Sequence, residues 1–146
     1  MFCLLAGCGN GEPIAPATLV VTGARVWTGD PKRVLLSRTA MRASADATLR
    51  RLGGPGQWLL NLPPTYVAGL QVLFRSVRAG TDPVVDDDVR TGATAMTGER
   101  RYVSLVPTQL HRLLDEPEAV AALRTFSTVL VGGAAVPASL REHAAA

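Results

Sequence analysis

The sequence has few cysteines, histidines, lysines and aromatic residues, and each shortage excludes a class of protein. Its 2 cysteines, Cys3 and Cys8, stand in the first eight residues, so they cannot staple a domain, and no histidine lies near them to complete a metal site. No apolar run reaches the ~18–20 residues that a membrane helix needs. The basic residues are scattered without interleaved aromatics, which argues against nucleic-acid binding. We therefore expect no metal ligands, no membrane span and no nucleic-acid partner.

What remains is the composition of one globular domain. The chain has 146 residues, of which 47% are hydrophobic and 18% charged, so it is not a disordered sequence. Because aromatics make up only 5%, the core must be built mainly from valine, leucine and alanine. The length is enough to bury a core if these residues form a whole domain.

The amino terminus allows two interpretations. Residues 5–8 (LAGC) are similar to the cleavage site of a bacterial lipoprotein, at which Cys8 would carry the lipid. No basic residue precedes the apolar stretch, however, and that stretch is shorter than the ~7–15 residues of a signal core. The other interpretation is a short strand or a frayed start. We expect a cytoplasmic protein, with a lipoprotein anchored through Cys8 as the alternative.

Strand-like and helix-like segments alternate along the chain with short connections. This order predicts an α/β fold, a layered parallel sheet with flanking helices. The expected helix 66–78 carries its large apolar residues on one side, at a spacing of three to four. The expected strands are 17–22, 57–62, 83–85, 102–106 and 128–131, and the expected helices are 38–52, 66–78, 107–114, 118–124 and 138–143, with a weakly helical 88–97.

Three segments could carry chemistry. Residues 28–32 (TGDPK) combine a glycine, whose backbone can approach phosphate closely, with the cation of Lys32. Residues 130–135 (LVGGAA) place two glycines between a strand and a helix, where open α/β sheets bind ligands. Residues 62–66 (LPPTY) place Tyr66 at the start of a helix, where it could line a pocket. The alternatives are a surface turn, a tight strand-to-helix turn and ordinary packing. We identify no catalytic residue, because no serine or histidine has a triad context.

Four stretches, taken together, resemble a known family. They are residues 31–38 (PKRVLLSR), 56–73 (GQWLLNLPPTYVAGLQVL), 104–114 (SLVPTQLHRLL) and 129–137 (VLVGGAAVP). Their order and separation are similar to those in the large domain of the adenylate-forming superfamily, which includes acyl-CoA synthetases and luciferases. Within it, the resemblance is to the bacterial o-succinylbenzoate–CoA ligases of menaquinone biosynthesis. It divides the chain into a poorly matched segment 1–23 and a partial AMP-binding large domain 24–146.

The resemblance implies an activity and its participants. A carboxylic acid would attack the α-phosphate of ATP, usually with Mg²⁺, to give acyl-AMP, and CoA would then form a thioester. It implies that Thr28, Gly29 and Lys32 contact the ATP phosphates and that Tyr66 stands beside the acyl pocket. It assigns part of the acyl and adenine pocket to three further residues: Gly132, Gly133 and Ala134.

The sequence also departs from the family pattern. Arg25, Val26 and Trp27 replace the small serine and glycine residues that let the phosphate loop close. The family's Tyr-Gly-x-[Ser/Thr]-Glu stretch, its ribose-binding aspartate and its small carboxyl-terminal domain have no counterpart within the 146 residues. We therefore expect the chain to be inactive alone. The alternative is a non-catalytic remnant or interaction module without a working nucleotide site.

Overall fold

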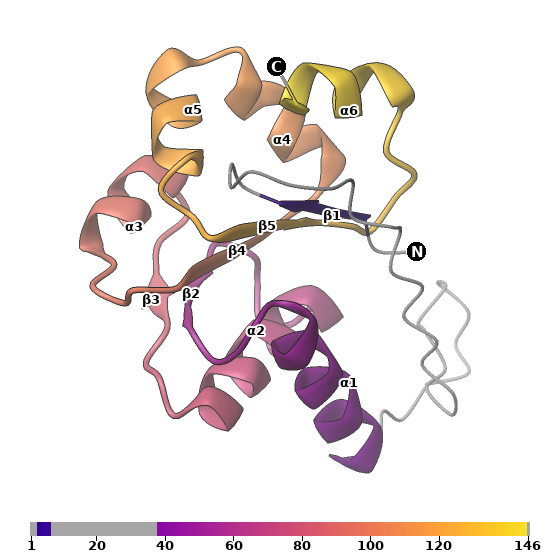
Figure 1. The fold of residues 1–146 in the computed structure, drawn as a ribbon, viewed down its shortest axis with the longest axis vertical. Helices are drawn as coiled ribbons and strands as arrows, with labels where there is room; N and C mark the ends of the chain where they lie inside the picture. Colours follow the sequence, from indigo (N-terminus) through magenta and orange to yellow (C-terminus); the bar gives the residue numbers. More distant parts are fainter. Residues whose placement is uncertain (1–2, 7–37, 146) are drawn as a thin grey trace.

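The computed structural model describes residues 3–6 and 38–145. Within them a single sheet has the strand order β1-β5-β4-β2-β3 (Figure 1). Strands β2, β3, β4 and β5 pair in parallel, and β1 pairs antiparallel with β5. The bounds are β1 Cys3–Ala6, β2 Gln57–Leu60, β3 Val84–Val85, β4 Arg101–Leu105 and β5 Thr128–Val131. The expected strand 17–22 lies outside the described residues.

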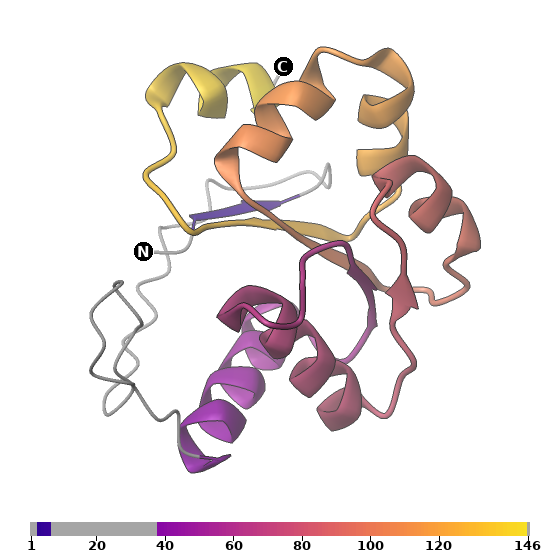
Figure 2. The ribbon, with the colours of Figure 1, turned by 180° about the vertical axis from the view of Figure 1, so that it is seen from behind.

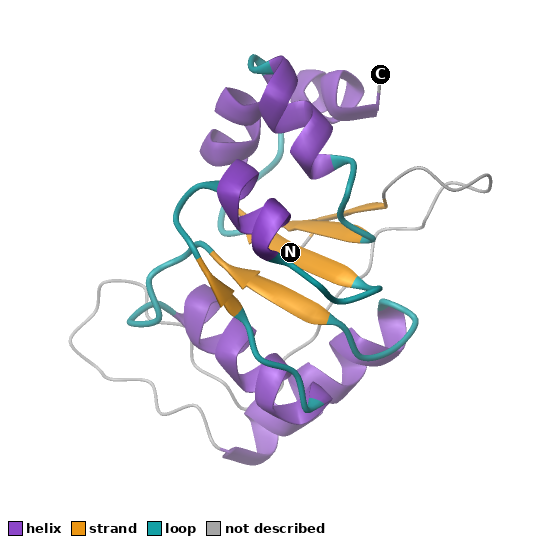
Figure 3. Cartoon of the chain, turned by 90° about the vertical axis from the view of Figure 1, so that its left-hand side faces the viewer, coloured by secondary structure: helices purple, strands orange, loops and turns teal. Residues whose placement is uncertain are grey.

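Helices cover both faces of this sheet (Figures 1 and 2). Helices α1 (Arg38–Arg51) and α2 (Val67–Ala79) lie together on one face. The other face carries α3 (Val89–Ala95), α4 (Pro107–Leu114), α5 (Pro117–Leu123) and α6 (Ala138–Ala145). Figure 3 shows the sheet between these two helical layers. The predicted α/β fold with flanking helices is therefore confirmed.

The two faces of the sheet build two separate cores, because side chains alternate along each strand. Leu59, Val103 and Val131 face the α3–α6 layer and belong to the larger cluster. Trp58, Tyr102 and Leu130 face the α1–α2 layer. The register pairs Trp58 with Tyr102 across β2 and β4, and their ring centroids lie 5.1 Å apart. Both rings are fully buried, so this aromatic pair forms part of the core where the sheet meets α2.

Helix α2 buries Val72 and packs Leu73 against the sheet, but it leaves other large apolar residues exposed. Leu70 is 43% exposed and Val77 is 80% exposed, although both are large hydrophobic residues. The side of α2 that is buried carries Gly69, Arg75 and Ser76, together with Val72. A surface helix normally turns its apolar side to the core. We call this surface the exposed apolar side of α2; it is formed by Tyr66, Val67, Leu70 and Val77. Another protein segment could pack against it.

The direction in which the chain leaves the sheet changes between β2 and β4. From β2 the chain passes through α2 to β3, which is the edge strand beside β2. From β4 it passes through α4 and α5 to β5, which lies toward the opposite edge of the sheet. These crossings also use opposite faces. The carboxyl ends of β2 and β4 therefore form a topological switch point, a place where α/β sheets commonly bind ligands.

The amino-terminal strand pairs Cys3 with Val131 and Ala6 with Thr128. The short-strand interpretation of this segment is therefore confirmed, while Cys8 lies outside the described residues. No helix among residues 38–145 is long and apolar enough to cross a membrane.

Candidate functional site

Two of the predicted segments follow strands at the same edge of the sheet, because the carboxyl ends of parallel strands point the same way. The Gly-Gly turn follows β5, and the Gly132 N–H donates to the Leu105 carbonyl at 3.0 Å, which holds the turn against the end of β4. Gly133 has φ 87°, a left-handed conformation that side chains strongly disfavour. Gly132 is buried, whereas Gly133 and Ala134 are exposed, so backbone groups of this turn are open to a ligand.

Tyr66 lies at the same edge, at the amino terminus of α2. Its N–H donates to the Pro63 carbonyl at 3.1 Å, and its carbonyl accepts from the Leu70 N–H at 3.0 Å. The side chain is 65% exposed. The alternative of ordinary packing therefore does not hold within the described residues, and the ring is exposed beside the start of α2. The other predicted contacts, Thr28, Gly29 and Lys32, lie outside the described residues.

Sequence reasoning missed the most unusual polar group of the described fold. Arg75 projects from α2 toward β2 and is only 5% exposed. Its guanidinium carbon lies 5.0 Å from the centre of the Trp58 ring. Burial lowers the pKa of Arg75 from its usual range to about 10. No carboxylate among residues 38–145 forms an ion pair with it.

Two N–H donors remain unpaired at this contact. Neither Arg75 Nε nor Trp58 Nε1 has a hydrogen-bond partner among the described residues, and both atoms are buried. One turn earlier on α2, the buried Gln71 Oε1 also lacks a partner. Buried donors and charges are costly unless they are paired, so native proteins rarely leave them alone. A buried cation beside a second free donor is suited to an anionic ligand such as a carboxylate.

The sequence contains little that could have revealed this arrangement. Arginine is almost never fully buried, so in a helix it is assigned to the surface by default. Arg75 also lies opposite the apolar side of α2, which reinforces that assignment. The guanidinium lies over Trp58 because the side of α2 that carries Arg75 faces the sheet.

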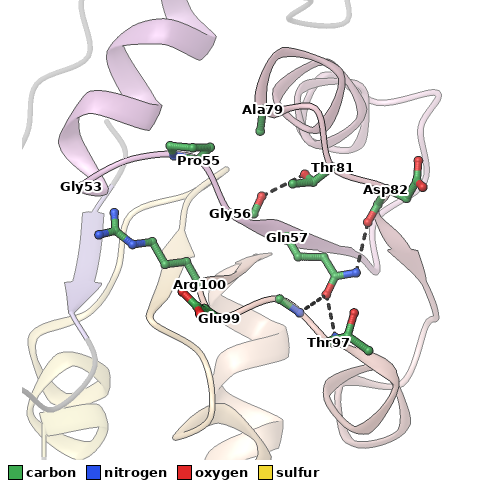
Figure 4. A pocket seen from close by; sticks show the side chains of 11 residues that line it. Gly53, Pro55, Gly56, Gln57, Ala79, Thr81, Asp82, Thr97, Glu99 and Arg100 are labelled. Atoms are coloured by element: carbon green, nitrogen blue, oxygen red, sulfur yellow. Dashed lines mark hydrogen bonds between the residues drawn. The ribbon is translucent and has the colours of Figure 1, made fainter.

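A hollow lies at the opposite edge of the sheet, at the amino ends of the strands (Figure 4). It has a volume of about 740 Å³. Gln57 lines it and makes three hydrogen bonds: its Nε2 donates to the Asp82 carbonyl, and its Oε1 accepts from the Thr97 and Gly98 N–H groups. These bonds fix the loops before β3 and β4. Gln57 is thus a structural residue, and we place the functional site at the carboxyl edge and on the α2 face.

The comparisons with known proteins identify the relatives of the chain. A "Probable 2-succinylbenzoate--CoA ligase" of Mycobacterium tuberculosis is 42% identical over 98% of this chain, and the match spans 39% of that protein. The 2-succinylbenzoate–CoA ligase of Escherichia coli K12 is 37% identical over 80% of this chain and 25% of its own length. No protein-family model matches the chain.

A solved structure matches as well. An arginine-to-lysine variant of E. coli MenE with bound OSB-AMS superposes with a TM-score of 0.59 and 31% identity, over 92% of this chain and 31% of that one. The fold and these matches place the chain among the adenylate-forming enzymes. Within that superfamily, its relatives are the 2-succinylbenzoate–CoA ligases. The chain spans about 39% of the length of the first of these relatives.

Proposed function

We propose that this chain supplies part of the large domain of an acid–CoA ligase that acts on 2-succinylbenzoate in the cytoplasm, with residues 24–146 as the AMP-binding portion and residues 1–23 outside it. The alternative with Cys8 acylated remains the competing proposal for location. The observation that carries the substrate assignment is the buried, unpaired donor pair of Arg75 and Trp58. It occurs in a chain whose relatives bear the name of a dicarboxylate ligase.

The substrate's chemistry explains the need for such a donor pair. 2-Succinylbenzoate has two carboxylates, and adenylation consumes only one of them. An oxygen of that carboxylate forms a bond to the α-phosphorus of ATP, and the bond from this phosphorus to pyrophosphate breaks. The CoA sulfur then attacks the acyl carbon and AMP leaves. The second carboxylate stays ionised throughout, and Arg75 with Trp58 would hold it by charge-assisted hydrogen bonds.

The other predicted contact residues would bind the nucleotide and the acyl group. The open Gly132–Gly133–Ala134 backbone would lie against the adenine ring and the acyl group, and Tyr66 would close the acyl pocket from the α2 side. Thr28, Gly29 and Lys32 would grip the ATP phosphates. Mg²⁺ would reach the site with ATP. Its chemistry would be to neutralise the phosphate charge.

We further propose that the chain is inactive alone. Arg25, Val26 and Trp27 stand where the family has small residues, and their bulk would keep the phosphate loop from closing. The apolar side of α2 (Tyr66, Val67, Leu70 and Val77) would be covered in a longer ligase chain, which fits relatives more than twice as long.

Calorimetry on the purified chain tests this proposal. We expect 2-succinylbenzoate to bind saturably and benzoate, which has one carboxylate, to bind at least ~10-fold more weakly. No pyrophosphate should be released on adding ATP. If a folded chain gives no heat with 2-succinylbenzoate or with millimolar ATP, the alternative of a remnant or interaction module is correct instead.

A further inference from the structure

A cleft of about 390 Å³ lies between the ends of β2 and β4 and the helices α3 and α4. Its volume is in the range of small-molecule sites. Val89, Leu105 and Leu113 give it apolar walls. Val89 and Leu105 belong to the core on the α3–α6 face, and Leu113 packs against that core. The cleft therefore lies on the opposite face of the sheet from Arg75, and its wall residue Leu105 also accepts the hydrogen bond from the Gly132 N–H.

Asn61 is the reason to regard this cleft as a built site. It follows β2 directly, lines the cleft and is only 6% exposed. Neither its Nδ2 nor its Oδ1 has a hydrogen-bond partner among the described residues. A buried carboxamide can donate two hydrogen bonds and accept two, and leaving all of them unmade costs several kcal/mol. A group from outside residues 38–145 is therefore needed to complete it.

The position of the cleft supports a ligand in this role. Asn61 and Leu105 stand at the carboxyl ends of β2 and β4, which is the topological switch point of the sheet. Ligands of open α/β sheets bind in this crevice because the crossing helices diverge there and leave it open. The same position would be hard to explain for a purely structural asparagine, which would be bonded to neighbouring backbone.

The charged residues at the mouth of the cleft determine which ligands it can bind. Arg90 is already held by Asp88 at 2.7 Å and by Glu116 at 3.1 Å, so it is occupied. Arg112 lines the same cleft and forms no ion pair with another described residue. Gln109 is anchored by the bond from the Val106 N–H to its Oε1, at 3.0 Å. Among the described residues that line the cleft, Arg112 and Asp87 are therefore the charged side chains outside an ion pair, and the Asn61 carboxamide lies below them.

We propose that this cleft binds a small planar monocarboxylate that carries a lactam or amide edge. The lactam edge presents an N–H beside a C=O and pairs with the Asn61 carboxamide through two hydrogen bonds, as asparagine does with a nucleobase edge. The ring lies between Val89, Leu105 and Leu113, and the carboxylate reaches Arg112.

Orotate is a suitable probe, because it combines a planar lactam ring with one carboxylate. We expect titration followed by ¹H–¹⁵N NMR to shift the Asn61 side-chain NH₂ signals and the Leu105 amide saturably. Two matched probes each lack one feature: uracil lacks the carboxylate, and benzoate lacks the lactam. Each should bind at least ~10-fold more weakly than orotate.

Two variants test whether Asn61 and Arg112 bind the ligand. Asn61→Leu should abolish the orotate shifts, and because it removes an unsatisfied polar group it should not lower stability. Arg112→Gln, at an exposed position, should weaken orotate by roughly 10-fold and leave uracil unchanged. The proposal is overturned if ~10 mM orotate leaves the Asn61 and Leu105 signals unmoved, or if Asn61→Leu binds orotate as the unaltered chain does. Arg75→Met should leave these shifts intact, so failure here is distinguishable from failure of the ligase proposal.

Discussion

Replacement of Arg75 by methionine should stabilise the chain, although it removes a buried polar contact. Burial lowers the pKa of Arg75 by more than two units, to about 10. At 1.36 kcal/mol per unit, the folded state therefore disfavours the charged guanidinium by about 3 kcal/mol. This penalty is fully present below pH ~10 and is relieved as the pH rises toward 12.5, so it acts at neutral pH. The cation–π contact with Trp58 returns about 1–2 kcal/mol.

Methionine has a similar length and removes both effects. Urea unfolding followed by circular dichroism at pH 7 should therefore show a net gain of about 1–2 kcal/mol for Arg75→Met, with an unchanged m-value. Arg78→Met is the matched control on the same helix. Arg78 is 36% exposed and pairs with Asp46 at 2.7 Å, so its loss should cost at most about 1 kcal/mol. If Arg75→Met lowers stability by 1 kcal/mol or more, Arg75 is paired within the chain and the unpaired-donor argument is wrong.

Three further changes test the edge of the sheet and the surface of α2. Gly133→Ala should cost about 1–2 kcal/mol in thermal or urea unfolding, because φ 87° is left-handed; an unchanged midpoint would contradict the turn geometry. Gly69→Ala should cost about 1–3 kcal/mol, because a Cβ would stand 2.4 Å from the Pro63 carbonyl oxygen; no loss would mean that α2 can move away. The double change Leu70→Gln and Val77→Gln should reduce self-association in sedimentation velocity while altering stability by less than about 0.5 kcal/mol per site; unchanged sedimentation would show that this surface is not adhesive.

The elements of the described fold could be predicted closely from local signals. Pro107 at the first position of α4 and the Gly80 stop of α2, at φ 68°, mark helix ends by backbone chemistry that does not depend on the rest of the fold. The strand 128–131 was predicted with its observed bounds because its β-branched run leads directly into the glycine turn. The predicted strand 57–62 was longer than β2, which ends at Leu60 before the two prolines.

The candidate site was predictable only where it lies in a turn. The Gly132–Gly133 segment and Tyr66 lie at strand ends, and a strand end can be recognised from sequence. Arg75 and Asn61 could not be found that way. Their importance comes from burial without a partner, and burial depends on how α2 and α3 pack on the sheet. The periodicity of α2 indicates an apolar side, but it does not say whether that side faces the sheet or the solvent.

The most direct test of the account is titration of the chain with OSB-AMS, the ligand bound in the E. coli MenE structure. Isothermal calorimetry should be run on the unaltered chain, on Arg75→Met and on Arg78→Met, with circular dichroism to verify folding. We expect saturable binding to the unaltered chain and to Arg78→Met, and a loss of at least ~10-fold for Arg75→Met. Equal affinity for all three folded proteins, or no binding to any of them, would contradict the claim that the α2 face holds a ligase substrate.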